Sequence, residues 1–143
     1  MRQRFLLAAV AACALQAQLA AAGALDPLKA KVKPGLYDIA VQLEAPGEKP
    51  QSSTMQSCTT ERNLDKGVLF GDGESGSSCE VKGFTMSGDT AAYAVACKGK
   101  PVFVTDHKVT VMGGGFSAVS TTKVDGKAIM TTKAQAKYAG PCK

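Results

Sequence analysis

His107 is the residue of this sequence best suited to acid–base chemistry, and it is the only histidine among 143 residues. A serine hydrolase needs a nucleophilic serine, a histidine base and an orienting acid in contact with one another. Asp106 is a poor candidate for that acid, because adjacent residues of a strand point to opposite faces of a sheet. The sequence also lacks a G-x-S-x-G motif. We therefore expect no enzymatic activity, and a periplasmic hydrolase that uses His107 is the alternative.

Two further segments could bind an ion or a phosphate, but each lacks the companions that such a site needs. An EF-hand loop that began at Asp72 would need glycine at its sixth position and glutamate at its twelfth. Those positions hold Ser77 and Gly83. The run Gly113–Gly115 lacks the lysine and serine that follow in a phosphate-binding loop, and it predicts a hairpin turn instead. We expect neither a metal nor a cofactor.

Four of the five cysteines indicate a covalent framework rather than redox chemistry. None of them has the C-x-x-C spacing of a thiol–disulfide oxidoreductase. An even number of cysteines in an exported chain is typical of disulfide bonds, and four cysteines allow three connectivities. The four are Cys58, Cys79, Cys97 and Cys142.

The first 22 residues have the three parts of a secretory signal peptide. Two arginines precede an apolar run, and small residues with A-x-A spacing follow it. Cleavage after Ala22 and cleavage after Ala24 fit this pattern equally well. The apolar run is too short to span a bilayer. We therefore expect residues 1–22 to be removed, no transmembrane segment to remain, and residues 23–143 to form a single β domain in the periplasm.

Cys13 supports a second interpretation of the N-terminus. Val10-Ala11-Ala12-Cys13 resembles the lipobox of bacterial lipoproteins, in which the cysteine is lipidated and becomes the first residue. However, the alanine-rich run continues past Cys13, and a signal cut there would be unusually short. We therefore favour a soluble periplasmic protein over a lipoprotein anchored through Cys13.

The charge of the chain argues against a nucleic-acid partner. Loss of Arg2 and Arg4 with the signal leaves 15 basic against 12 acidic residues, a net charge of +3. The lysines are spread singly, without the basic and aromatic patch that is typical of a nucleic-acid site.

The segment 79–97 predicts a hairpin that turns at Gly88, because glycine can adopt the positive φ of a tight turn. Pairing outward from Gly88 sets Thr85 against Ala91 and places Cys79 directly opposite Cys97. Cysteines opposite each other on antiparallel strands are close enough for a disulfide. We therefore predict a bond between Cys79 and Cys97, which leaves Cys58 to bond Cys142.

Further strands are predicted around this hairpin. Residues 37–44 alternate apolar and polar side chains, as a strand with one buried face does. Residues 51–60 are polar and β-tolerant and predict an edge strand that carries Cys58. Residues 59–64 could open a single helical turn with a threonine cap. Residues 102–112 predict two strands interrupted at 106–108, and residues 23–33 predict a linker.

Asp125-Gly126 allows two hairpin geometries for the last connection. A two-residue turn pairs Val124 with Lys127, whereas a three-residue loop pairs Lys123 with Lys127. We favour the three-residue loop, because it keeps the small and apolar residues of both strands on one face. The flanking strands alternate small residues with threonine, so their register is weakly specified and their edges are open to a partner strand.

An ordered set of short marks resembles a family of exported Gram-negative bacterial proteins, domain-of-unknown-function family 3617. The marks are Lys33-Pro34-Gly35-Leu36-Tyr37, Gln56-Ser57-Cys58-Thr59, the pair Cys79 and Cys97 around a hairpin, and Gly140-Pro141-Cys142. Tyr37 departs from the family, which usually has tryptophan there. The resemblance implies a periplasmic antiparallel β protein and carries over no catalytic residue.

Together these observations predict an all-β fold: a single curved antiparallel sheet or partly open barrel of about seven strands, stabilised by disulfides. We expect a non-enzymatic protein that binds or has a structural role in the cell envelope. Strand addition by another envelope protein is the favoured form of binding. A small apolar ligand is the alternative, although a chain without tryptophan offers few aromatic side chains for a specific pocket.

Overall fold

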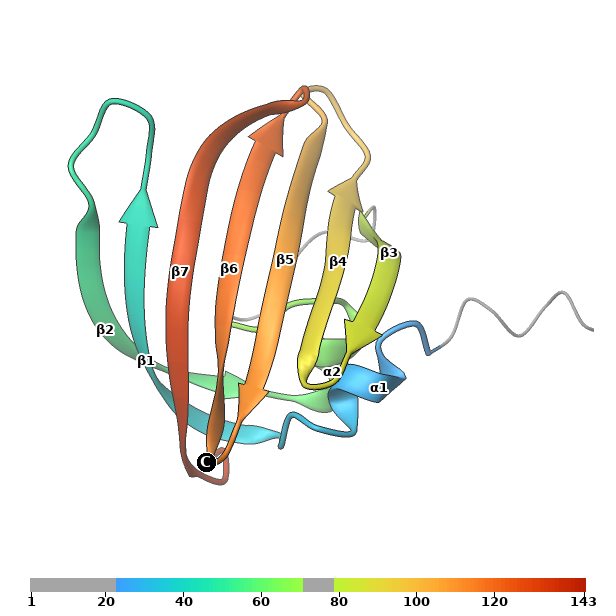
Figure 1. Ribbon diagram of the computed structural model, residues 1–143, viewed down its shortest axis with the longest axis vertical. Coiled ribbons are helices and arrows are strands. Elements are labelled where there is room, and N and C mark those ends of the chain that lie inside the picture. Colours follow the sequence, from blue (N-terminus) through green and yellow to red (C-terminus); the bar gives the residue numbers. More distant parts are fainter. Residues whose placement is uncertain (1–22, 71–78) are drawn as a thin grey trace, which may run out of the picture.

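Alternating apolar and polar residues form seven antiparallel strands in the computed structural model, which describes residues 23–70 and 79–143. The strands lie in one curved sheet, in the order β2-β1-β7-β6-β5-β4-β3, and the sheet is open between β2 and β3 (Figure 1). The predicted fold class is therefore confirmed. The strand bounds are β1 (Gly35–Glu44), β2 (Gln51–Thr59), β3 (Cys79–Ser87), β4 (Thr90–Cys97), β5 (Phe103–Met112), β6 (Gly115–Val124) and β7 (Lys127–Gly140).

The path of the chain explains why β2 and β3 are the two edges. After the β1–β2 hairpin, the chain passes through helix α2 (Glu61–Asp65), and β3 then forms the opposite edge of the sheet. From there β3 to β7 follow one another as a meander that leads back to β1. β7 then pairs with β1. The expectation of open edges among the later strands is therefore wrong, because β6 and β7 each have a neighbour on both sides. The predicted edge strand over residues 51–60 is confirmed as β2.

The core lies on one face of the sheet, which we call the inner face. Tyr37 and Phe116 are almost completely buried there, and their rings meet edge to face at 5.1 Å between centroids. Ile39, Val109 and Ala134 are buried on the same face. Lysines and glutamines occupy the alternate positions on the opposite side, which we call the outer face. This alternation is the pattern of an antiparallel sheet with one buried side.

Two short helices cover the inner face at the same end of the sheet (Figure 1). Residues 23–33 form helix α1 (Asp26–Lys29) with its flanking turns, so the predicted linker is wrong. Leu25, Leu28 and Val32 are buried in the core, because their spacing places them on one side of a helical segment. The predicted cap of α2 is confirmed: the Thr60 hydroxyl accepts a hydrogen bond from the backbone N–H of Asn63 at 3.1 Å.

Two β-bulges correct the predicted registers. In the β3–β4 hairpin, Cys79 pairs with Cys97 as expected, but the register shifts between Lys82 and Thr85, so Thr85 pairs with Ala92 rather than Ala91. The shift lies at Gly83, whose φ of +62° suits glycine.

Strand β5 is continuous, which makes the predicted interruption at residues 106–108 wrong.

The favoured three-residue loop at Asp125 and Gly126 is also wrong. Both residues have positive φ, 47° and 81°, and Val124 pairs with Lys127 as in a two-residue turn. A register shift between Thr122 and Lys123 then restores the inward direction of the small residues further along β7. The sequence argument assumed that the turn alone decides which residues of β7 face inward. It therefore missed a two-residue turn combined with a bulge.

The two disulfides each fasten one edge strand. Cys58 of β2 is bonded to Cys142 near the C-terminus, with 5.7 Å between their Cα atoms. Cys79 of β3 is bonded to Cys97 of the neighbouring strand β4. Both margins of the open sheet are therefore covalently tied to its interior.

Candidate functional site

His107 lies on the inner face of β5, where the strand pairing brings two polar or aromatic partners to it. Ser120 is directly opposite on β6, and its Oγ lies 2.8 Å from His107 Nδ1. Tyr93 is opposite on β4, and its ring stacks on the imidazole at 4.9 Å between centroids. The Tyr93 hydroxyl donates to the carbonyl of Gly67 at 3.1 Å and so holds the segment after α2 against the sheet.

The electrostatics of His107 do not favour base catalysis. Burial lowers the pKa of His107 to about 4, and the nearby Asp106 carboxylate raises it only partly. Asp106 points to the outer face and forms an ion pair with Lys123 at 2.6 Å, as the alternation argument predicted. The backbone N–H groups around Ser120 belong to a strand with a neighbour on both sides, so they are occupied by the ladder. Among residues 23–70 and 79–143, the geometry therefore gives a serine–histidine contact without an orienting acid or an oxyanion hole.

Ser120 could not be identified from the sequence. Its contact with His107 depends on the β5–β6 register, and the predicted interruption of β5 at residues 106–108 removed His107 from that ladder. The same face continues with Thr105 and Thr122, whose hydroxyl oxygens lie 3.3 Å apart. His107, Ser120, Thr105 and Thr122 therefore form an uncharged polar strip on the inner face.

Strand β2 presents an open edge with few features that would discourage pairing. Within the part of the chain that the structure describes, its nine residues, Gln51–Thr59, pair only with β1, and that register runs without a shift from Gly35↔Thr59 to Leu43↔Gln51. Residues 51–56 are exposed. No residue of QSSTMQSCT is charged, and none is proline. A regular, uncharged edge of this kind is a template for another strand.

Strand β3, at the other end of the sheet, is protected from edge pairing in two ways. Glu80 and Lys82 carry opposite charges and form an ion pair at 2.9 Å. The bulge at Gly83 interrupts the ladder. The disulfide Cys79–Cys97 fastens β3 to β4, but it does not distinguish the two edges, because the Cys58–Cys142 bond fastens β2 in the same way. Charges and bulges are the devices by which natural sheets avoid unwanted edge pairing.

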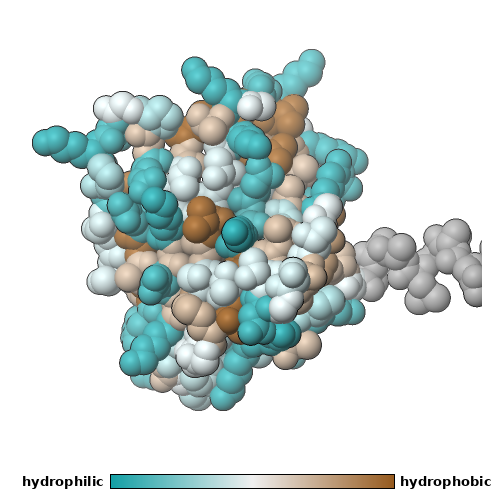
Figure 2. All heavy atoms as spheres, in the orientation of Figure 1, coloured by the Kyte–Doolittle hydropathy of each residue, from teal (hydrophilic) through white to brown (hydrophobic). Residues whose placement is uncertain are grey.

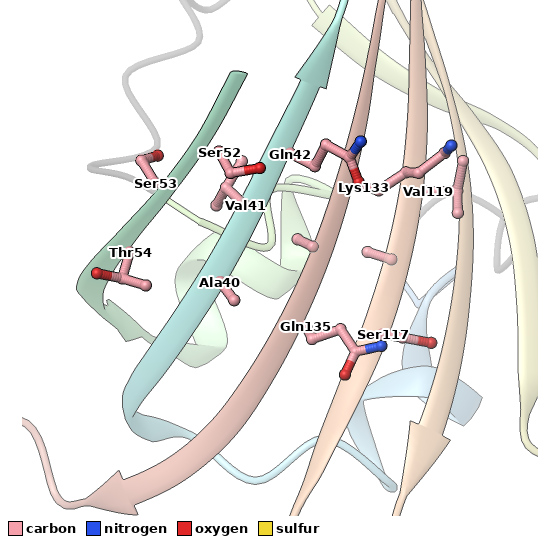
Figure 3. Close-up of a pocket in the computed structure, with 12 residues that line it drawn as sticks. Ala40, Val41, Gln42, Ser52, Ser53, Thr54, Ser117, Val119, Lys133 and Gln135 are labelled. Carbon is pink, nitrogen blue, oxygen red and sulfur yellow. The ribbon is translucent and has the colours of Figure 1, made fainter. Parts of the chain in front are cut away.

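A shallow groove of about 720 Å³ lies beside β2. In Figure 3 the side chains of Gln42, Lys133 and Val119 gather at one level across β1, β7 and β6, and Gln135 and Ser117 lie at the next level. The small side chain of Ala40 leaves the space between them, and Ser52 and Thr54 border the groove from β2. A second groove of about 600 Å³ shares Ala40 and Thr54.

The outer face next to these grooves is mainly polar. Figure 2 shows hydrophilic and pale side chains over most of this view, with separate hydrophobic ones between them. Lys133 is paired with Glu44 at 2.7 Å, and Gln56 donates to Asp38 at 2.7 Å. The two charged side chains of β1, the strand that pairs with β2, are therefore engaged within the chain, and Glu48 and Lys49, of opposite charge, lie in the connection before β2.

The remaining candidates from the sequence are structural or lie outside the described residues. The signal segment 1–22, with Cys13, and the acidic loop at Asp72 lie outside them. Gly113 and Gly114 form the turn before β6, as predicted. Within residues 23–70 and 79–143, His, Cys, Asp and Glu form no group of three or more that could hold a metal ion. No helix in the same ranges has the length and apolar character needed to cross a membrane.

Comparison with known proteins gives one relationship. The family described as "Protein of unknown function (DUF3617)" matches residues 32–142, from the end of the α1 segment to the last cysteine. No curated protein and no solved structure matches the chain.

Proposed function

We propose, for a chain that belongs to the DUF3617 family, that it is an exported binding protein which takes up an extended polypeptide segment along β2. The single observation that carries this proposal is the contrast within one sheet between the uncharged, regular edge β2 and the protected edge β3. Strand addition uses backbone hydrogen bonds for affinity and neighbouring side-chain spaces for specificity.

The chemistry of the margin defines what kind of segment fits. The exposed part of β2 offers hydroxyl and amide side chains with one apolar residue, Met55, which is 47% exposed on the inner face. An added strand would continue the sheet beside Ser52 and Thr54 and place alternate side chains along the outer grooves. A partner segment rich in small, uncharged and β-branched residues therefore fits best.

Export accounts for the covalent framework of the domain. Two disulfides are typical of an oxidising compartment such as the periplasm. The first residues of the described domain support removal of residues 1–22 rather than 1–24. The carbonyl of Gly23 accepts the N–H of Asp26 at 3.0 Å, and Leu25 is 3% exposed in the core. Cleavage after Ala22 keeps this turn, and the intact mass of the exported protein tests it.

Photo-crosslinking in cells that export the protein tests strand capture. A photoreactive amino acid at Thr54 reports on the β2 edge, and the same residue at Thr85 is the matched control on β3, because both positions are exposed. We expect adducts from position 54 that map to one continuous segment, and few from position 85. The absence of adducts at 54, or equal adducts at both positions, would contradict the proposal.

A further inference from the structure

We propose that the segment which pairs with β2 is β2 of a second copy of this chain, related to the first by a two-fold axis near Thr54. This inference rests on the proposed function, because it names the partner for the same open edge. The result is one antiparallel sheet that continues across two copies.

The register follows from which part of β2 is accessible. Residues 51–56 are exposed, whereas Thr59 is completely buried and its hydroxyl donates to the carbonyl of Leu69 at 2.9 Å. An added strand can therefore lie along the first part of β2 but not along its end. Opposed residues of an antiparallel pair share a face, so a two-fold axis perpendicular to the sheet lies midway between one residue and the same residue of the second copy. An axis at Thr54 pairs residues 51–57 with themselves in reverse.

The side chains that this register opposes are compatible. On the outer face Thr54 meets Thr54 of the second copy, and Ser52 meets Gln56. On the inner face Met55, which is 47% exposed, lies against Ser53 of the second copy. Threonine–threonine pairs and pairs of hydroxyl and amide groups are favourable across strands. No opposed pair brings like charges together, because residues 51–57 contain no charged side chain.

Longer-range charge does not oppose the pairing either. The nearest charged groups on β1 are Asp38, which accepts from Gln56, and Glu44, which is paired with Lys133. Glu48 and Lys49, in the connection before β2, carry opposite charges, and other lysines such as Lys123 and Lys137 lie on strands further from this edge. Two copies can therefore approach through β2 with little electrostatic repulsion.

The protected edge β3 explains why such association would stop at two. Self-pairing through one edge is isologous and closes at a dimer, whereas pairing between two different edges would continue into a fibre. The ion pair of Glu80 with Lys82 and the bulge at Gly83 block β3. The grooves beside β2, which both include Thr54, would meet across the two-fold axis.

The area available sets the expected affinity. One short strand pair buries less surface than the about 1,200 Å² of a small stable complex. We therefore expect a reversible dimer with a Kd on the order of micromolar. Sedimentation equilibrium of the mature chain over a wide concentration range should show a mass that rises from one copy to two and no further.

A charge-swap pair tests the axis directly. Thr54→Lys places two ammonium groups opposite each other in the dimer, and Thr54→Glu places two carboxylates there. Each variant alone should remain monomeric at concentrations at which the unsubstituted chain is dimeric, and an equal mixture should recover the dimer. Thr85→Lys and Thr85→Glu on β3 are the matched controls and should leave the dimer unchanged. Circular dichroism with urea unfolding confirms that all four variants are folded.

The outcomes separate this inference from the proposed function. A chain that stays monomeric at all concentrations, while photo-crosslinking at Thr54 captures a different polypeptide, overturns the dimer and keeps strand addition. A monomer without crosslinks overturns both. A dimer that persists in Thr54→Lys and Thr54→Glu places the interface elsewhere and overturns the inference.

Discussion

β2 and β3 are the two edge strands of the same open sheet, but only β3 carries features that protect an edge from pairing with another strand. β2 is regular, exposed and uncharged over its first six residues. β3 has an ion pair and a bulge within nine residues. Both strands are fastened to the sheet by a disulfide, so the difference is not one of anchoring. Both edges are exposed because the sheet does not close into a barrel. The contrast therefore indicates that the absence of protecting features is specific to β2.

Removal of either disulfide should cause the largest loss of stability, and it tests how strongly each edge strand is held to the sheet. The Cys58–Cys142 bond closes 84 sequence positions and the Cys79–Cys97 bond closes 18. In the loop-entropy model these closures stabilise the fold by about 4.5 and about 3 kcal/mol. Replacing both members of a pair by alanine should therefore lower the free energy of unfolding more at the β2 margin than at the β3 margin.

Urea unfolding of the two double variants measures this difference, with the unsubstituted chain as reference. Equal losses would show that both edges depend on their disulfides to the same extent. Peptide mapping without reduction provides the accompanying check, since a peptide joining Cys58 to Cys79 would contradict the framework.

A change in the middle of the sheet should affect the stability of the fold without distinguishing the edges. Burial holds the pKa of His107 at about 4, below the value of about 6.5 expected in the unfolded chain. The unfolded state therefore binds a proton more readily between these values. The stability contributed by neutral His107 is complete above pH 6.5 and is lost as the pH falls towards 4.

His107→Phe keeps a ring against Tyr93 but cannot titrate. Between pH 7 and pH 4 the unsubstituted chain should lose about 2 to 3 kcal/mol more stability than this variant. Urea titrations at several pH values give the comparison. Parallel pH profiles for the two proteins would show that His107 is not held neutral by the fold.

The sequence predicted the local pattern of this fold well because alternation and turn residues act over short distances. Tyr37 and Ile39 identified the buried side of β1, and the uncharged composition of residues 51–60 identified an edge strand. The two-residue turn at Asp125 was missed, because a bulge elsewhere in the hairpin reconciled it with the face pattern. Bulges leave little signal in sequence when one extra residue is polar or small.

The strand order could not be predicted, because it depends on contacts between distant segments. β1 pairs with β7 across about ninety residues, and this pairing places the β3–β4 hairpin at an edge. The same long-range order decides that Ser120 meets His107 and that Leu28 joins the core. The protected character of β3 could be read from Glu80, Lys82 and Gly83 only once the strand was known to lie at an edge.

Two glycines near β3 have positive φ for different reasons: Gly67 is packed closely against side chains of the core, whereas Gly83 forms the bulge and faces open space. Gly67 has φ +72°, and a Cβ there would lie 2.9 Å from Val95 Cγ2 and 3.1 Å from Tyr93 Cε2. Gly83 has φ +62° but faces open space. Gly67→Ala should destabilise the fold by about 2 to 3 kcal/mol, because it adds a clash to the backbone strain, and Gly83→Ala by about 1 kcal/mol from the backbone alone. Thermal unfolding of both variants tests this order, and a larger loss at Gly83 would reverse it.

Removal of the charges on β3 should change stability least and association most. Glu80 and Lys82 are both more than half exposed, and the pKa of Glu80 is lowered mainly by its hydrogen bond with Lys82. Exposed pairs of this kind contribute little to folding, so Glu80→Thr with Lys82→Thr should leave the unfolding transition almost unchanged. The double variant would make β3 resemble β2 in charge while keeping the bulge at Gly83. If charge is what protects β3, light scattering should show species larger than a dimer; if the variant matches the unsubstituted chain, the bulge alone protects this edge.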